Sequence, residues 1–247
     1  MKQHYDRYTS EDHAIWNILF DRQIQNLQGK SCQAYLDCVD RLAPEMAPSQ
    51  VPDFGPLERR LQAETGWRIE VVKGLIPVED FFQLLAEKRF CSSTWLRSRE
   101  QLDYLEEPDM FHDTFGHIPL LIDPTYAAFM ERFGQIGVKY LHDPAMLTAL
   151  QRLYWFTVEF GLMKGDTRTE IYGAGILSSF GESNHIYNDP IEVLPYDIEA
   201  VIHNHFVNSE IQMRYYEIGT FEDLYHSLYR LEAIAEAGLD LEARIVR

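Results

Sequence analysis

Apolar residues recur every three or four positions along most of this chain, which is the spacing of one buried face of an α-helix. The first such pattern follows Ser10, a good helix-capping residue, and carries Trp16 and Leu19 before Gly29 can end it. A shorter helical pattern surrounds Tyr35. Further helices are predicted at residues 57–64, 78–88, 125–141, 145–163, 196–206 and 221–237.

Signals for β-strands are few. Trp67, Ile69 and Val71 alternate with their neighbours as in a short, half-buried strand. Residues 43–56 are rich in proline and form the only linker-like stretch, so we expect a surface loop there. No internal repeat is visible. The pattern predicts a mainly α fold with minor β structure, in a single domain that spans residues 1–247.

Composition narrows the possible partners. The 247 residues are 46% hydrophobic, enough for one large core, and their formal net charge of -17 disfavours nucleic acid and anionic membrane surfaces. No uncharged apolar run approaches the ~20 residues of a membrane span, and the amino terminus is polar. Three cysteines without C-x-x-C spacing favour reduced thiols in a cytoplasmic protein over disulfides or a thiolate zinc site.

The stretch EPDMFHDTFGHIPLL places two histidines, His112 and His117, five residues apart. On a regular α-helix these side chains would point about 140° apart, so they could not face one point. Gly116 and Pro119 are helix breakers, and we expect a break there to swing His117 towards His112. The alternative is a pair of core histidines held by backbone carbonyls. A zinc protease is disfavoured because the His-Glu-x-x-His spacing is absent.

Glu159 is a candidate third ligand. It lies within LYWFTVEFGLM, on a helix that must bury several aromatic side chains, where an unpaired carboxylate costs several kcal/mol. A metal would compensate its charge, and so would a buried arginine such as Arg97 or Arg152. Two imidazoles and one carboxylate leave open coordination positions and favour Fe(II) oxygen chemistry.

A third segment, IYGAGILSSFGES, combines three small residues with two serines. Its glycines permit close approach of the backbone to another group, although a tight turn between short strands is an alternative. The spacing is not that of the G-x-G-x-x-G dinucleotide fingerprint, so no nucleotide is predicted.

In this order and at these separations, EPDMFHDTFGHIPLL, LYWFTVEFGL and YGAGILSSFGE resemble the catalytic domain of the pterin-dependent aromatic amino acid hydroxylases. The resemblance extends over about residues 8–228, nearly the whole chain. It implies a non-haem iron monooxygenase that uses O2 and a tetrahydropterin, with hydroxylation of L-phenylalanine to L-tyrosine as the expected reaction. Tryptophan 5-hydroxylation and phenylalanine 3-hydroxylation are alternatives within the family.

The resemblance also implies roles for individual residues. His112, His117 and Glu159 match the iron ligands, with Tyr154 beside the metal, and Arg97 matches the arginine that pairs with the substrate carboxylate. Residues that match the rest of the amino acid site are Asp109, Ser178, Phe90, Pro108, Trp155 and Gly175. Residues that match the pterin site are Gly74, Leu75, Ile76, Phe81 and Asp113.

The chain departs from the animal members of this family. It leaves no room for a regulatory domain or a long tetramerisation helix, so we expect a monomer or weak dimer. Leu105 replaces a threonine that contacts the substrate, and Asp113 replaces a glutamate, and both replacements resemble the bacterial members of the family. Outside the family, the alternatives are a zinc hydrolase with the same ligands and a non-catalytic metal-binding helical protein.

Overall fold

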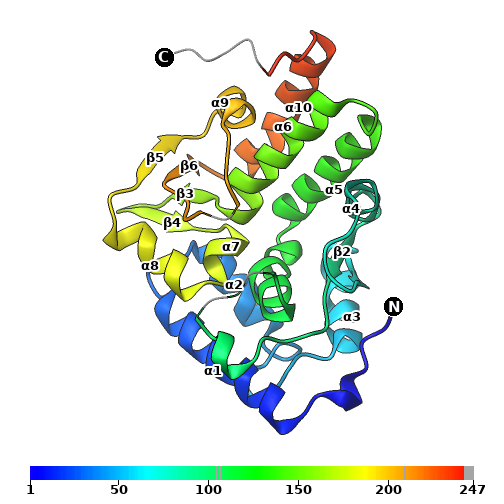
Figure 1. The fold of residues 1–247 in the computed structure, drawn as a ribbon, viewed down its shortest axis with the longest axis vertical. Coiled ribbons are helices and arrows are strands. Elements are labelled where there is room, and N and C mark those ends of the chain that lie inside the picture. Colours follow the sequence, from blue (N-terminus) through cyan, green and yellow to red (C-terminus); the bar gives the residue numbers. More distant parts are fainter. Residues whose placement is uncertain (104, 106, 209, 242–247) are drawn as a thin grey trace.

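The structure, a computed structural model that describes residues 1–103, 105, 107–208 and 210–241, is built mainly from α-helices (Figure 1). The α-helices are α1 (Ser10–Asn26), α2 (Gln33–Leu42), α3 (Phe54–Glu64), α4 (Val78–Ala86), α5 (Pro124–Lys139), α6 (Pro144–Tyr154), α7 (Ala174–Leu177), α8 (Phe180–Asn188), α9 (Ile198–His203) and α10 (Phe221–Glu236). None of the helices formed by these residues combines the length and apolar composition that crossing a bilayer requires.

Within the described residues, the β structure forms two small sheets. Their strands are β1 (Arg68–Val71), β2 (Arg89–Ser92), β3 (Leu162–Lys164), β4 (Thr169–Ile171), β5 (Glu192–Pro195) and β6 (Arg214–Ile218). β1 and β2 pair in parallel, with Ile69 opposite Phe90. The other sheet has the order β4-β3-β6-β5, in which β3 and β4 are antiparallel and the other neighbours are parallel. The prediction of a mainly α fold with minor β structure is confirmed.

Capping residues set where the first helices begin. Thr9, rather than the predicted Ser10, caps α1: its side chain accepts from the Asp12 amide, and the Asp12 carboxylate accepts from the Thr9 amide. Asp53 caps α3 with its side chain alone, which accepts from the Gly55 amide, so that helix begins at Phe54 and takes up the last residues of the predicted 43–56 loop. The local signal was present in both cases, and the predicted starts were wrong by one and three residues.

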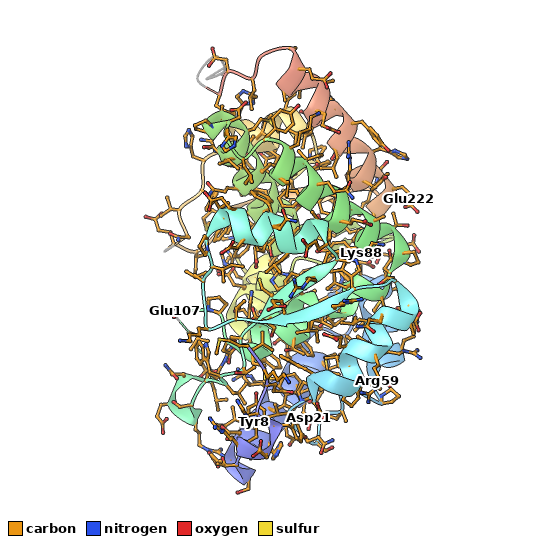
Figure 2. The ribbon with its side chains drawn as sticks, turned by 90° about the vertical axis from the view of Figure 1, so that its right-hand side faces the viewer. Tyr8, Asp21, Arg59, Lys88, Glu107 and Glu222 are labelled. Carbon is orange, nitrogen blue, oxygen red and sulfur yellow. The ribbon has the colours of Figure 1, made fainter. Side chains whose placement is uncertain are left out.

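A single hydrophobic core joins the helices. α5 lies between α4 and α10, and it approaches α4 so closely that a side chain at Gly137 would collide with the Phe82 ring. α1 lies at one end of the molecule and α10 runs towards the other (Figure 1). In Figure 2, Asp21 of α1 lies near the bottom, and Glu222, in the first turn of α10, lies at the right-hand edge in the upper half. Trp16 and Trp67 are fully buried in the same core.

Two predicted helices have different ends in the structure. The 145–163 pattern is interrupted: α6 stops at Tyr154, a wider helical turn follows, and Met163 already lies in β3. The 196–206 helix shortens to α9, with Asp197 as its cap. The strands β2 to β6 and the helix α7 were not predicted, because these segments are too short to show a hydrophobic period. The nine-residue α8 was also missed, because its buried face includes the polar Ser183 and His185.

Candidate metal centre and substrate cavity

Both histidines of the first motif lie on one π-helical segment, His112–His117. A π-helix closes its hydrogen bonds between residues five apart, so its first and last side chains rise on the same side of the backbone. The Nε2 atoms of His112 and His117 are 3.1 Å apart. The predicted break at Gly116 and Pro119 is therefore wrong: the helix continues in a wider form, and Pro119 begins the 3₁₀ turn that follows.

Packing against α7 explains the glycine inside this segment. A Cβ atom at Gly116 would lie 2.8 Å from the carbonyl oxygen of Ala174, so only glycine allows the two backbones to meet. The same segment is tied to α2 because the Tyr35 hydroxyl donates to the carbonyl of Phe115 at 2.7 Å. The geometry that brings the histidines together thus depends on contacts from distant parts of the chain.

Glu159 ends a second π-helical segment, Trp155–Glu159. Its carboxylate lies 3.1 Å from the Nε2 atom of His117 and 3.7 Å from that of His112. The two arginines considered as alternative partners are engaged elsewhere: Arg97 pairs with a different carboxylate, and Arg152 donates to the carbonyl of Ile202. The charge of Glu159, whose side chain is only 15% exposed, therefore faces the two imidazoles.

Hydrogen bonds fix the orientation of the His112 ring. The Ser178 hydroxyl donates to the carbonyl of Ala174 at 2.8 Å, so its oxygen is left to accept from Nδ1 of His112 at 2.9 Å. This arrangement places the ring proton on Nδ1 and leaves the lone pair of Nε2 facing His117 and Glu159. Burial lowers the pKa of His112 to about 4, which favours the neutral imidazole.

The surroundings of Glu159 also favour the protonation state of a metal ligand. Burial alone would raise the pKa of its carboxyl group, but the neighbouring His117 and His112, with hydrogen bonds from His117 and Tyr154, outweigh burial and lower the pKa. An ionised carboxylate therefore faces a neutral His112 at neutral pH. These are the protonation states that metal binding needs.

The donor atoms fit a divalent metal ion. One atom from each of His112, His117 and Glu159 lies within 4.8 Å of the others. Ligands placed at right angles around a metal, at bonds near 2.1 Å, have donor atoms roughly 3 Å apart. The separations between these side chains are close to that value, and three donors on one side suit non-haem iron.

A cavity of about 440 Å³ opens beside these three side chains. Aromatic rings form much of its wall: the ring centroid of Phe90 is 4.8 Å from that of His117, and Tyr154 stacks at 6.3 Å on the same imidazole. The sequence-predicted residues that line it are Gly74, Leu75, Ile76, Phe81, Phe90, Pro108, His112, Asp113, His117, Tyr154, Trp155 and Glu159.

Four of the predicted site residues do not line the cavity. Arg97 and Asp109 form a buried pair, in which Nε and Nη2 of the guanidinium donate to the two carboxylate oxygens at 2.9 and 2.8 Å. Asp109 also accepts from the backbone amide of His112. Ser178 contacts His112, and a Cβ atom at Gly175 would lie 3.1 Å from a carboxylate oxygen of Glu159. Asp109, Ser178 and Gly175 thus contact the proposed ligands from outside the cavity, whereas Arg97 contacts Asp109.

Several residues of the cavity wall were missed in the sequence. The most informative are Phe133 of α5 and Phe206, which follows α9. Phe206 stacks on Trp155 with centroids 4.4 Å apart. Neither carries a sequence signal beyond hydrophobicity, because an aromatic at helical spacing is usually a core residue. Their place in the wall follows only from tertiary contacts.

Comparison with known proteins decides the family. The model of the family described as biopterin-dependent aromatic amino acid hydroxylase matches residues 4–237. This chain belongs to that family. The phenylalanine-4-hydroxylase of Chromobacterium violaceum is 44% identical over 227 residues, which is 91% of this chain and 75% of the relative. The enzyme of the same name from Caulobacter vibrioides is 37% identical over 96% of this chain and 83% of its own length.

Solved structures of the hydroxylase family agree with this fold. A variant of the C. violaceum phenylalanine hydroxylase superposes with a TM-score of 0.93 at 42% identity, covering 99% of this chain and 87% of the other. Another structure of that enzyme, with bound iron(III) and 7,8-dihydrobiopterin, gives a TM-score of 0.89 at 42% identity, over 96% and 86% of the two chains. The predicted family, fold class, enzyme class and family cofactors, iron and a pterin, are confirmed.

Proposed function

We propose that this hydroxylase converts L-phenylalanine to L-tyrosine, using O2 and a tetrahydropterin, with Fe(II) held by His112, His117 and Glu159. The observation that carries the proposal is the convergence of these three donors on one side of an aromatic-walled cavity. It is supported by the relatives named phenylalanine-4-hydroxylase and by a C. violaceum structure described with iron and phenylalanine bound.

The protein's part in the chemistry is to hold and shield the metal site. Bound iron and reduced pterin would together supply the activation of O2. His112 and His117 would bind as neutral imidazoles and Glu159 as an anion, which leaves the cavity side for small ligands. Tyr154 and Phe90 cover His117 and keep bulk water away from it.

The amino acid would lie with its ring against Phe90, Pro108 and Trp155, which line the cavity near the ligands. We assign its carboxylate to Arg97 on the strength of the family resemblance: this residue does not line the cavity in this structure, but its Nη1 takes no part in the pair with Asp109. Asp109 would then orient Arg97 rather than touch the substrate. Ser178 and Gly175 would act through His112 and Glu159, which they contact.

The pterin would occupy the outer part of the cavity. Phe81 offers a ring face, and its centroid is 5.3 Å from that of Tyr154. Gly74, Leu75 and Ile76 contribute a neighbouring loop in which Leu75 is 87% exposed. The Asp113 carboxylate accepts from the Ser93 amide at 2.7 Å, and burial raises the pKa of Asp113 to about 7. We assign to Asp113 a water-mediated contact with the pterin.

Product analysis tests the reaction. The enzyme, loaded anaerobically with Fe(II), receives a tetrahydropterin, air and either phenylalanine or tryptophan. We expect 4-hydroxylation of phenylalanine. Formation of 3-hydroxyphenylalanine, or a preference for tryptophan, would assign the chain to another reaction of the family. Activity supported by zinc, without pterin or O2, would instead identify a hydrolase.

The proposal also covers the domain organisation, partners, oligomeric state and location of the enzyme. Residues 1–247 would act as one catalytic domain on small molecules, without nucleic acid or membrane partners, as a monomer or weak dimer. A cytoplasmic location remains a prediction, and the three cysteines, none in a disulfide, are consistent with it. Size-exclusion chromatography with light scattering measures the oligomeric state.

A further inference from the structure

The indole of Trp155 is held by a side chain that lies outside the cavity. Its Nε1 atom donates to Oε1 of Gln212 at 2.8 Å. Gln212 belongs to the connection between α9 and β6, more than fifty residues further along the chain. An indole nitrogen can only donate, so this contact requires the amide oxygen of Gln212 to face the ring.

The other end of the amide is fixed as well. Nε2 of Gln212 donates to the carbonyl of Arg214 at 2.9 Å. Both halves of the amide therefore have partners that match their chemistry, and rotating the amide by half a turn would lose both bonds. The side chain of Gln212 has one favourable orientation, and that orientation presents an acceptor to Trp155.

The backbone of Gln212 is anchored from two further directions. Its carbonyl oxygen accepts from the Tyr215 hydroxyl at 2.7 Å and lies 3.0 Å from Nε2 of His185 in α8. Nδ1 of His185 lies 2.7 Å from a carboxylate oxygen of Asp189. Elements on both sides of Gln212 thus fix the point from which its side chain reaches the indole.

Ring stacking alone does not fix the orientation of the Trp155 indole. Trp155 stacks on Phe206 with the ring planes 11° apart and packs on Phe160 at 4.5 Å. Stacking fixes the plane of a ring but allows it to slide and rotate within that plane. The hydrogen bond to Gln212 fixes the remaining rotation, and the ring edge that faces the cavity follows from it.

We propose that Gln212 is a positioning residue, which sets the orientation of Trp155 and through it the fit of the aromatic substrate. This inference rests on the proposed function, because it takes Trp155 to be part of the wall against which the substrate ring packs. Gln212 does not line the cavity and is not a catalytic residue. Its effect should therefore fall on substrate binding and alignment more than on the metal.

The test compares three variants with a matched control. Gln212→Leu removes the acceptor, Gln212→Glu keeps an acceptor oxygen, and Trp155→Phe removes the donor. Gln62→Leu makes the same change on the exposed face of α3. The first readout is the ¹⁵N–¹H spectrum of the four indole groups in metal-free enzyme, in which the signal lost in Trp155→Phe identifies the Trp155 resonance.

We expect Gln212→Leu to shift this resonance upfield and to speed its exchange with solvent, while Gln212→Glu and the control leave it in place. In the iron-loaded enzyme, loss of one neutral hydrogen bond should raise the KM for phenylalanine about fivefold, with a smaller change in kcat. Less tyrosine should form per pterin oxidised. Adding Gln212→Leu to Trp155→Phe should change KM no further, because both act through one contact.

An unchanged indole resonance in Gln212→Leu would overturn the inference, as would additive effects of the two substitutions on KM. If the wild-type enzyme forms no tyrosine, the proposed function fails, but the resonance still decides whether Gln212 holds the indole. A loss of folding in Gln212→Leu would show as collapse of all four indole signals. Gln212→Glu, which keeps the acceptor but loses the donor to Arg214, must then retain a hydrogen-bonded indole resonance, and loss of that resonance also overturns the inference.

Discussion

Removing the guanidinium of Arg97 should destabilise the whole domain. Arg97 is 7% exposed and Asp109 is fully buried, so the Arg97→Ala variant leaves a carboxylate without its counter-charge in the protein interior. Breaking a buried pair in this way costs about 3–5 kcal/mol. Each kcal/mol lowers the melting temperature of a chain of this size by about 2–4 °C, so the expected fall is roughly 6–20 °C.

The neighbouring Arg99 provides a matched control. Its pair with Glu11 has both side chains at least half exposed, at 50% and 56%, and such pairs often contribute nothing measurable. Thermal unfolding followed by circular dichroism, with a chelator present to exclude stabilisation by metal, compares the two alanine variants. The reasoning is wrong if Arg97→Ala melts within 2 °C (about one kcal/mol) of Arg99→Ala.

A second substitution isolates the buried charge. Adding Asp109→Asn to Arg97→Ala should recover part of the lost stability, because an amide oxygen still accepts from the His112 backbone while the negative charge is gone. Below its melting temperature, Arg97→Ala should bind iron normally but show a strongly raised KM for phenylalanine, since a charged contact to the substrate is lost. Loss of iron would contradict the assignment of Arg97 to the substrate.

Two other substitutions test the support of the ligands. Ser178→Ala removes the hydrogen-bond partner of Nδ1 of His112 and should weaken metal binding about 10-fold to 100-fold. Competition with a fluorescent chelator measures the affinity, and an unchanged value would show that Ser178 does not orient His112. Gly116→Ala forces a Cβ atom against Ala174 and should lower the free energy of unfolding by about 1–3 kcal/mol while displacing His117. A variant with the melting temperature and iron content of the wild-type enzyme would refute the close approach.

The sequence predicted the ligands more securely than the way in which they meet. His112, His117 and Glu159 could be chosen because their residue types and surroundings suggest a metal. The π-helical form of both segments could not be predicted, since nothing local distinguishes it from an α-helix with a break. That form depends on packing of Gly116 against α7 and on the bond from Tyr35, which join segments far apart in the sequence.

Most of the short β-strands also could not be predicted from local sequence. β1 was predicted from its alternation, whereas β3 and β4 have only three residues each and β3 follows directly on an aromatic-rich helix. β3 is a strand because it pairs with β6, which lies about fifty residues away, and β4 is a strand because it pairs with β3. In the cavity wall, Phe206 likewise gains its role from contact with Trp155, and the position of Gln212 could be recognised only once the chain had folded.

The central claim is that His112, His117 and Glu159 hold the iron that this enzyme needs to hydroxylate phenylalanine. Anaerobic titration with Fe(II), followed by addition of phenylalanine, tetrahydropterin and air, tests it in the wild-type enzyme and in Glu159→Ala. We expect one Fe(II) per wild-type chain and tyrosine as the product, with neither tight iron binding nor tyrosine in the variant. Full iron content and turnover in Glu159→Ala would contradict it.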